Sequence, residues 1–342
     1  MPPASLPGEL RLFPLPEDEA GAAAGNGQPS GRPRRRRRAP RRPSPLLLAV
    51  DGNGLAHRAF HAVGGVDGEP GAATGRVLAM LVRIAAEVQP TACVIGFDDP
   101  IHSVRRQRHP AYKAARPPKP DELVELLDEL PGLLRQLGLC VVVPPGLEAD
   151  DVLGSAAALA SRRVVAGTLA TGDQDAFALV SPTVRVLLLV AGGRVEQVSP
   201  SWLRARYGVG PERYLEFAAL RGDSSDCLPG VRGVGAVTAA KLLAAYPDVA
   251  AALADPAGVA RLLGSWVAEA LVTHRDTYEL NRELMAIRSD VALDPAACSR
   301  RLDRRGVTET LAERGLDDLV DRVLAGFALL GRAAWRRAPE PA

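Results

Sequence analysis

Residues 46–51, LLLAVD, form an apolar run that stops at an aspartate, and the expected fold is built outward from them. A helical stretch follows around residues 74–88, and a second apolar run at residues 92–97 also stops at an aspartate, Asp98. The alternation continues, with helices and strands expected at residues 121–137, 139–143, 149–161 and 164–170. Short strands that alternate with helices predict an α/β fold, with a mainly parallel central sheet and helices on both faces.

The composition changes along the chain and divides it into four expected segments. The first is rich in Gly, Ala, Pro and Arg and lacks apolar periodicity, which predicts a disordered tail, either a solvated arm or an electrostatic tether for DNA. After a hairpin expected at residues 184–198, the pattern becomes helical. The segments are a tail at 1–44, an α/β domain at 45–199, an all-α domain at 200–332 and a frayed end at 333–342.

The overall composition, 47% hydrophobic and 24% charged, is typical of a soluble globular protein. No apolar run is long enough to cross a bilayer, so no membrane partner is expected. The four cysteines form no C-x-x-C pair, which disfavours a disulfide scaffold or a zinc site and favours a reducing cytoplasm. The net charge of +2 does not indicate nucleic acid, so polyanion binding would rely on local basic patches.

Carboxylates gather where the expected strands end. One Asp after a strand is usually a helix N-cap, but three acids within one helical turn exceed what capping needs. Additional acids near a helix start contribute only about 0.3–1 kcal/mol each, so a bound cation explains them better. The carboxyl ends of parallel strands meet at one edge of a sheet. That edge should bring together Asp51, Asp98, Glu148, Asp150, Asp151, Asp173 and Asp175.

This ligand set consists of carboxylate oxygens alone. Such oxygens favour Mg²⁺, with Mn²⁺ as a substitute, over zinc. Two ions of this kind can stabilise both the attacking and the leaving oxygen of a phosphodiester. The residues therefore predict metal-assisted phosphodiester hydrolysis.

A basic segment, SVRRQRHPAYKAARPPKP, occupies residues 103–120. It holds two of the three lysines of a chain that has 39 arginines. Cations that follow phosphates and a ring that can stack on a base suit single-stranded nucleic acid, although an ordinary exposed basic loop is the alternative. The residues expected to act on the substrate are Arg105, Tyr112, Lys113, Arg116 and Lys119.

The stretch LRGDSSDCLPGVRGVGAVTAAKLL at residues 220–243 contains a helix-hairpin-helix signature at 228–243. A glycine-rich turn between helices is the plain interpretation, but two acids precede it and the third lysine lies within it. Glycines let backbone N–H groups approach a phosphate at a helix N-terminus, which gives duplex binding without base reading. The expected DNA contacts are Gly230, Gly233, Gly235, Thr238 and Lys241.

In this order, the segments resemble the bacterial 5′→3′ exonuclease family, a flap-endonuclease-like nuclease found alone or as the N-terminal domain of DNA polymerase I. The resemblance extends from about residue 46 to about residue 330. The motifs that carry it are AVDGNGLAHRAFHA, GFDD, AYKAAR, GLEADDVLGS, TGDQDAFALVS and RGDSSDCLPGVRGVGAVTAAKLL. Such a series of spaced motifs is far more specific than any single one.

The resemblance implies a PIN-like nuclease domain, a helical arch near residues 100–120 for the free 5′ strand, and a helix-hairpin-helix domain that grips duplex DNA and holds K⁺. It implies that Asp223 and Asp226 join the seven acids in binding metal and that Arg58 faces the scissile phosphate. Lys113 and Arg116 would act from the arch. Two departures from the family pattern are His57, where an aromatic residue is common, and Cys227, where Asn is usual.

The implied function is 5′→3′ exonuclease and structure-specific 5′-flap endonuclease activity on DNA, and on RNA-primer 5′ strands, by two-metal-ion hydrolysis in replication and repair. Expected partners are DNA with 5′ ends, flaps or nicks, an RNA/DNA hybrid and a separate DNA polymerase. The expected state is a standalone, monomeric, cytoplasmic and nucleoid-associated enzyme. The alternatives are a catalytically weak structure-specific DNA-binding protein, which should lack some acids, and a PIN-type ribonuclease, which normally lacks the hairpin segment.

Overall fold

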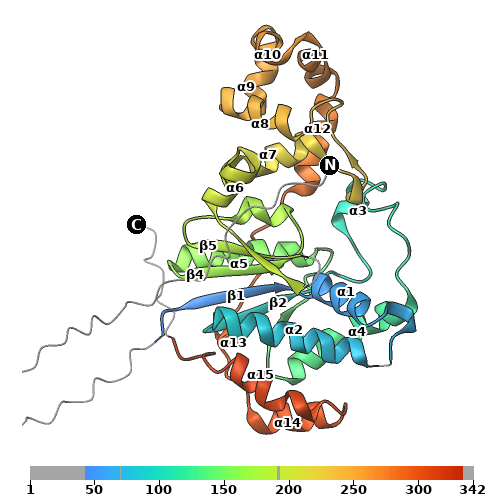
Figure 1. Cartoon of the computed structure of the whole chain (residues 1–342), viewed down its shortest axis with the longest axis vertical. Coiled ribbons are helices and arrows are strands. Elements are labelled where there is room, and N and C mark those ends of the chain that lie inside the picture. Colours follow the sequence, from blue (N-terminus) through green and yellow to red (C-terminus); the bar gives the residue numbers. More distant parts are fainter. Residues whose placement is uncertain (1–42, 70, 191–192, 334–342) are drawn as a thin grey trace, which may run out of the picture. The chain divides into compact units, whose positions relative to one another are not determined.

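A computed structural model describes residues 43–69, 71–190 and 193–333 (Figure 1). The tail expected at residues 1–44, except its last two residues, lies outside the described part. The same is true of the expected C-terminal end beyond residue 333 and of Gly192 in the expected hairpin turn.

One six-stranded sheet organises the fold, with strand order β3-β2-β1-β4-β5-β6. Neighbouring strands are parallel from β3 to β5, and only β6 is antiparallel, to β5. The central strand is β1, where Leu48 pairs with Cys93 of β2 and Thr168 of β4. The strands are β1 (Leu46–Asp51), β2 (Ala92–Gly96), β3 (Cys140–Val142), β4 (Ala166–Thr171), β5 (Val184–Leu189) and β6 (Val195–Val198).

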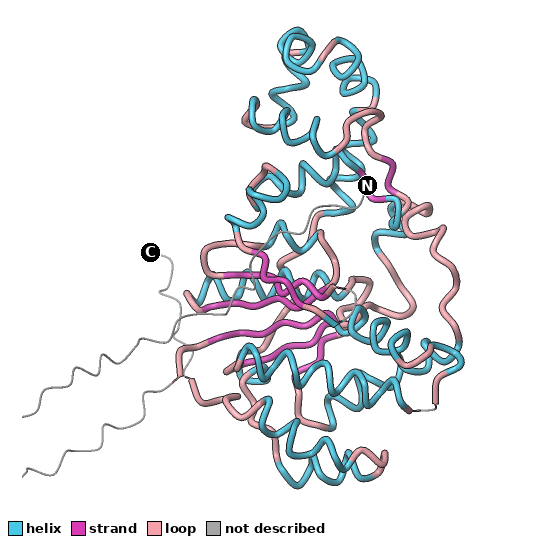
Figure 2. The backbone as a smooth tube through the Cα atoms, in the orientation of Figure 1, coloured by secondary structure: helices cyan, strands magenta, loops and turns pink. Residues whose placement is uncertain are grey.

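Helices cover both faces of this sheet, as Figure 2 shows in cyan and magenta. Side chains alternate between the faces of a strand, and in β1 both sets are apolar and buried. Leu47 and Ala49 belong to the core beneath α5 (Ala149–Arg163). Leu48 and Val50 belong to the core shared with α1 (Gly52–Ala62), α2 (Ala72–Val88) and α4 (Asp121–Gln136). The predicted fold class is confirmed.

The start of β4 differs from the expected residue 164. Helix α5 continues to Arg163, and Val164 then takes a left-handed conformation, with φ of 53°, that ends the helix. The strand begins only at Ala166. An apolar run alone cannot distinguish the end of a helix from the start of a strand.

A helical region follows the sheet, and an aromatic cluster lies where it begins. Five rings pack edge-on or tilted against one another there, with the centroids of contacting rings 5.2 to 6.2 Å apart; they belong to Phe177, Trp202, Tyr207, Tyr214 and Phe217. The elements are α6 (Pro200–Tyr207), α7 (Pro211–Arg221), β7 (Gly222–Asp223), β8 (Leu228–Pro229), α8 (Ala236–Ala245), α9 (Val249–Ala254), α10 (Pro256–Leu263), α11 (Ser265–Thr273) and α12 (Arg275–Met285).

The chain then returns to the sheet, which the sequence analysis did not anticipate. Residues 286–294 cross α5, where Val291 N–H donates to Ser155 Oγ at 2.9 Å. Helices α13 (Pro295–Cys298), α14 (Arg304–Ala312) and α15 (Val320–Gly326) follow. Helix α13 contacts β2, while α14 and α15, red in Figure 1, lie beside α4 and α2. Buried Val307, Leu311 and Val323 complete the core on that face. The last third of the expected all-α segment at 200–332 therefore packs on the α/β layers, and the expected domain bounds stay a prediction.

Two inferences from composition can be compared with the structure. No helix in the described ranges is long and apolar enough to span a membrane. The cysteines are scattered in sequence, yet Cys140 and Cys298 are neighbours in space, as free thiols with their Sγ atoms 3.6 Å apart. Sequence spacing gave no sign of this pair, because it joins β3 to the returning α13.

Candidate active site

Two carboxylates stand at the carboxyl edge of the sheet and are held by local hydrogen bonds. Asp51 ends β1 and caps α1, accepting from Gly54 N–H at 2.8 Å, and its other oxygen accepts from Thr171 Oγ1 at 3.0 Å. Asp98 follows β2 and accepts from Ala149 N–H, at the start of α5, at 2.9 Å. The sheet thus places both acids at its carboxyl edge, as the parallel topology predicted.

Burial and mutual repulsion disfavour the ionised forms of the acids in this cluster. Burial, together with Asp98 and Asp173, raises the pKa of Asp51 to about 6. Burial and three other aspartates, Asp173 among them, raise the pKa of Asp175 to about 8. The pKa values of Asp98, Asp150 and Asp173 are also raised, in each case chiefly by burial. Without a bound cation, the folded protein therefore favours the neutral, protonated forms of these acids over their ionised forms.

The donor set suits a hard divalent cation by charge and by atom type, since it consists of carboxylate oxygens. The present spacing does not form a finished binding site, because no three His, Cys, Asp or Glu side chains within the described ranges are grouped so that they could hold a metal ion. Cations from the basic segment stand among the acids instead.

Lys113 and Arg116 contact the acids directly. Lys113 Nζ lies 3.0 Å from Glu148 Oε2 and 3.9 Å from Asp226 Oδ2, and Arg116 pairs with Asp226. Burial would lower the pKa of Lys113, but Glu148, Asp226 and Asp98 outweigh it and raise that pKa. The predicted catalytic cations and the predicted metal carboxylates are thus brought together.

Arg105 was expected to contact DNA, but it is directed into the protein. Its guanidinium donates to both oxygens of Asp151, at 2.9 and 2.8 Å, and its Nε donates to Leu284 O at 2.9 Å. Asp151 has no exposed surface and also accepts from the N–H groups of Glu148 and Arg288, at 3.1 and 2.9 Å. Both Asp151 oxygens are thus fully engaged, and the pair ties the basic segment, α5 and the returning chain together.

Tyr112 was expected to stack on a base, which its position contradicts. Its side chain is only 4% exposed, belongs to the apolar core, and donates its hydroxyl to Glu148 Oε2 at 3.2 Å. The expected helical arch is also reduced to α3 (Val104–Arg108), followed by turns. Composition could not predict the burial of Tyr112, because an aromatic ring in a polar segment can either be exposed for stacking on a base or be buried in the core.

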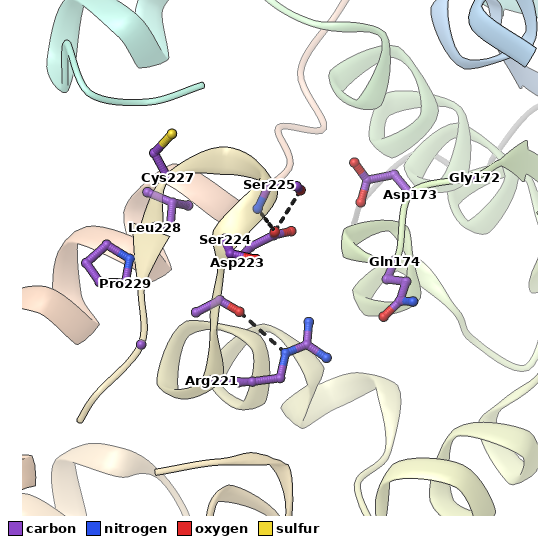
Figure 3. A pocket seen from close by; sticks show the side chains of 12 residues that line it. Gly172, Asp173, Gln174, Arg221, Asp223, Ser224, Ser225, Cys227, Leu228 and Pro229 are labelled. Atoms are coloured by element: carbon purple, nitrogen blue, oxygen red, sulfur yellow. Dashed lines mark hydrogen bonds between the residues drawn. The ribbon is translucent and has the colours of Figure 1, made fainter. Parts of the chain in front are cut away.

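A cavity of about 890 Å³ separates the end of β4 from the segment after α7 (Figure 3). Asp173 and Gln174 stand on one side, and Asp223 faces them from the other. Asp223 Oδ1 accepts from Ser225 N–H and Oγ, at 2.8 and 2.7 Å. Arg221 also lines the cavity and lowers the pKa of Asp175, against the stronger effect of burial. Asp223 and Asp226 therefore approach the acids at the sheet edge.

The glycine-rich hairpin leads from β8 into α8. A Cβ on Gly230 would lie 2.1 Å from Arg221 O, so only glycine allows the chain to cross the end of α7. Gly233 has φ of +75°, and the ring of Trp266 packs against its Cα. No side chain caps α8 at Gly235, while Thr238 is half-buried and Lys241 is exposed. An uncapped helix start with a nearby lysine is suited to a phosphate.

Comparison with known proteins identifies the family. Residues 46–208 match the model for the 5′-3′ exonuclease N-terminal, resolvase-like domain, and residues 209–305 match its C-terminal domain, described as a SAM fold. The chain belongs to the 5′-3′ exonuclease family. It is 37% identical over 292 residues to DNA polymerase I of Mycobacterium tuberculosis H37Rv, and 34% identical over 275 residues to the thermostable DNA polymerase I of Thermus aquaticus. The matches cover 83% and 80% of this chain, but only 31% and 32% of those relatives.

Two solved structures of nucleases share the fold. The T5 5′-exonuclease with bound zinc aligns with a TM-score of 0.60 at 18% identity, covering 84% of this chain and 99% of that one. Flap endonuclease-1 from Methanococcus jannaschii aligns with a TM-score of 0.52 at 17% identity, covering 82% and 92%. The predicted family and the predicted enzyme class, a nuclease, are confirmed.

The structure shows the surroundings of the two residues that depart from the exonuclease pattern. Cys227 adopts φ of 60°, a conformation that Asn tolerates better than Cys, and its Sγ accepts from Ala115 N–H at 3.3 Å. His57 lines a second cavity beside Arg58. Burial and the neighbouring Lys119, His61 and Arg116 lower the pKa of His57 to about 4, so it is neutral at pH 7.

Several residues at the site escaped the sequence analysis. Asn53 Oδ1 accepts from Asp98 N–H at 3.0 Å, and Thr171 orients Asp51. Arg76, Arg83 and Arg194 line the same cavity as the acids. Only the position of Asn53, two residues after a strand-ending Asp, offered a signal in the sequence.

Proposed function

We propose that this chain hydrolyses phosphodiester bonds near the 5′ ends of DNA strands, acting as a 5′→3′ exonuclease and on 5′ flaps. The observation that carries the proposal is the group of buried and half-buried aspartates with raised pKa values, set between the cations of the basic segment and an uncapped glycine hairpin. A catalytically weak DNA-binding protein would not need such uncompensated acids. A PIN-type ribonuclease would not need the hairpin.

Divalent cations complete the proposed site. Mg²⁺, or Mn²⁺ in its place, would be held by two or more groups drawn from Asp51, Asp98, Glu148, Asp150, Asp173, Asp175, Asp223 and Asp226. When bound, such ions supply positive charge that stabilises the attacking and leaving oxygens of a phosphodiester. We assign Asp151 a positioning role, because Arg105 and two backbone N–H groups already use its oxygens. K⁺ at the hairpin remains part of the proposal.

The cations of the basic segment would exchange partners during the reaction. Lys113 and Arg116 now neutralise Glu148 and Asp226. If those acids held divalent cations, Lys113 and Arg116 would be free to bind the phosphates of the substrate, because charge-assisted hydrogen bonds form to phosphate as well as to carboxylate. Arg58, whose guanidinium lies against Gly172 at the cavity, would neutralise the scissile phosphate.

The hairpin would hold the duplex while the acids act on the 5′ strand. Gly230, Gly233 and Gly235 would present backbone N–H groups to one phosphate, with Thr238 and Lys241 supporting them. This mode of binding recognises the backbone and not the bases. Lys119, exposed at the cavity, would contact the single strand. The division into an α/β nuclease part and a helical DNA-binding part belongs to the same proposal.

The cellular setting follows from the proposed chemistry. An RNA/DNA hybrid is a second substrate, a separate DNA polymerase is a natural partner, and a monomer in the cytoplasm close to the nucleoid is the expected state. Removal of primers and flaps during replication and repair would be the biological role.

The deciding experiment uses a DNA with a 5′ flap, labelled on the flap, and a single-stranded RNA of equal length. We expect cleavage near the flap junction with Mg²⁺ or Mn²⁺, none with excess chelator, and little cleavage of the RNA. Tight binding without cleavage would favour the non-catalytic alternative. Preferred cleavage of the RNA would favour the ribonuclease.

A further inference from the structure

The second cavity, about 900 Å³ in volume, extends beyond the acids along α2. Asp51, Asp98, Asp150 and Asp173 line part of it. The rest is lined by α1, by one face of α2, by the basic segment and by residues in or next to β5 and β6. Its volume is comparable to that of small-molecule sites, roughly 300–1,000 Å³, and is too small for a duplex. It can admit only a short piece of single strand.

Three arginines line the part of this cavity beyond the acids. Arg76 and Arg83 are seven residues apart, so they share one face of α2 about 10 Å apart along its axis. Arg194 stands opposite, just before β6. Arg83 reaches toward that side, because a Cβ on Gly193 would lie 3.8 Å from Arg83 Nη1. The three cations therefore surround one space.

Within the described part of the chain, these arginines lack the acidic side-chain partners that other surface arginines have. Arg275 and Arg305, also on exposed helix faces, pair with Glu279 and Glu309 one turn away, each at 2.7 Å. Arg76, Arg83 and Arg194 form no hydrogen bond or ion pair to a side chain among the described residues. Glu87 lines the same cavity one turn from Arg83, yet no ion pair joins the two within that part of the chain. Three exposed cations that line one cavity and are not paired with acids of the described ranges are suited to bind the phosphates of a polyanion.

Neighbouring groups add positive charge at the same place. Lys119 and Arg116 line the cavity, and together with His61 they help lower the pKa of His57, after the larger effect of burial. A polyanion that left the acids in this direction would meet cations continuously. The acids themselves would repel it without bound metal.

We infer that Arg76, Arg83 and Arg194 bind the phosphates of the released 5′ strand, the few nucleotides on the 5′ side of the cut. The inference rests on the proposed function, since it assigns one strand of that substrate to this part of the cavity. The contacts are to phosphates, so they carry no base preference. These contacts strengthen the binding of substrates with long 5′ overhangs and not of substrates with short ones.

The test compares flaps of one and of six nucleotides. The variants are Arg76→Gln, Arg83→Gln, Arg194→Gln and the triple variant. The matched control is Arg162→Gln, an exposed arginine on α5 that does not line the cavity. Binding is measured over a range of salt concentrations with excess Ca²⁺, and cleavage is measured with Mg²⁺. Circular dichroism confirms that each variant is folded.

For the six-nucleotide flap, each substitution should flatten the dependence of log affinity on log salt by about 0.7, the value for one phosphate contact on a single strand. The triple variant should lose about 2 units of slope. For the one-nucleotide flap, the slope should not change, and Arg162→Gln should alter neither substrate. Equal losses on both flaps, or none on either, would overturn the inference.

The outcome is separable from the proposed function. If the wild-type chain cleaves both flaps and the variants behave like it, only the inference fails. If the wild-type chain cleaves neither flap but the variants lose affinity for the long flap alone, the inference stands and the nuclease proposal fails.

Discussion

Asp150 and Asp151 are adjacent in the sequence, yet they experience opposite surroundings. Successive residues of a helix point about 100° apart, so Asp151 turns inward and Asp150 turns toward the other acids. Arg105 and two N–H groups compensate Asp151. Burial, Asp173 and Asp51 instead raise the pKa of Asp150 well above its ordinary value. Removing the negative charge should therefore change the stability of the folded protein in opposite directions at the two positions.

We predict that Asp151→Asn lowers the free energy of unfolding by about 3–5 kcal/mol, because it removes the charged partner that binds both Nη groups of Arg105 and leaves only Glu148 beside that guanidinium. Asp150→Asn should raise the stability of the metal-free protein at neutral pH and reduce cleavage by orders of magnitude. Thermal unfolding with chelator and turnover at graded Mg²⁺ concentrations measure both effects. If Asp151→Asn kept its unfolding temperature and changed only the Mg²⁺ requirement, Asp151 would be a metal ligand.

The same acids predict how stability depends on pH without metal. The pKa of Asp51 is about 6 and that of Asp175 about 8 in the folded chain, against an ordinary value of 3.8. A raised folded-state pKa gives stability that is complete below about pH 4 and is lost as pH rises through those values. With chelator, the unfolding temperature should be higher at about pH 5.5 than at about pH 8.5. Excess Mg²⁺ or Mn²⁺ should reduce the difference, and a difference unchanged by metal would contradict the proposed site.

At the scale of elements, the hairpin between β8 and α8 is a rigid structure that needs its glycines. Gly230 crosses the end of α7, and Gly233 supports the ring of Trp266. Lys241 lies beyond these contacts and is exposed. The backbone can thus be formed without Lys241, which leaves its charge for the duplex.

Lys241→Ala should weaken binding to nicked duplex DNA and lower the salt slope by about 0.9, because one phosphate contact disappears. Stability and the response to flap length should not change. Salt titrations by fluorescence anisotropy measure the slope. Arg322→Ala removes an exposed charge from α15 and serves as the control; an equal effect there would mean that only overall charge matters.

At the scale of the whole molecule, all described residues belong to one compact unit, because the C-terminal helices cover α2 and α4. Leu311 of α14 has no exposed surface and lies in the core that contains Leu48 of β1. The last helices therefore stabilise the first strand. The helical region between them is tied to the sheet at both of its ends.

Leu311→Ala should reduce the free energy of unfolding by about 2–5 kcal/mol, the cost of a cavity in a packed core. Calorimetry should record one main transition that moves as a whole. Leu262, which is 49% exposed, provides the control, and Leu262→Ala should change stability little. A separate transition that Leu311→Ala leaves in place would contradict the single unit.

Local patterns in the sequence were sufficient for the parallel sheet, the acids at its carboxyl edge and the glycine hairpin, because periodicity and turn chemistry report the conformation of neighbouring residues. Only the tertiary structure decided which polar groups would meet. Arg105 and Asp151 are 46 residues apart, and Arg105 contacts Leu284 across 179 residues. Residues that are distant in the sequence also bury Tyr112, compensate the charge of Asp151 and bring the three arginines together around the second cavity. Their charges interact through space and leave no periodic trace in the sequence.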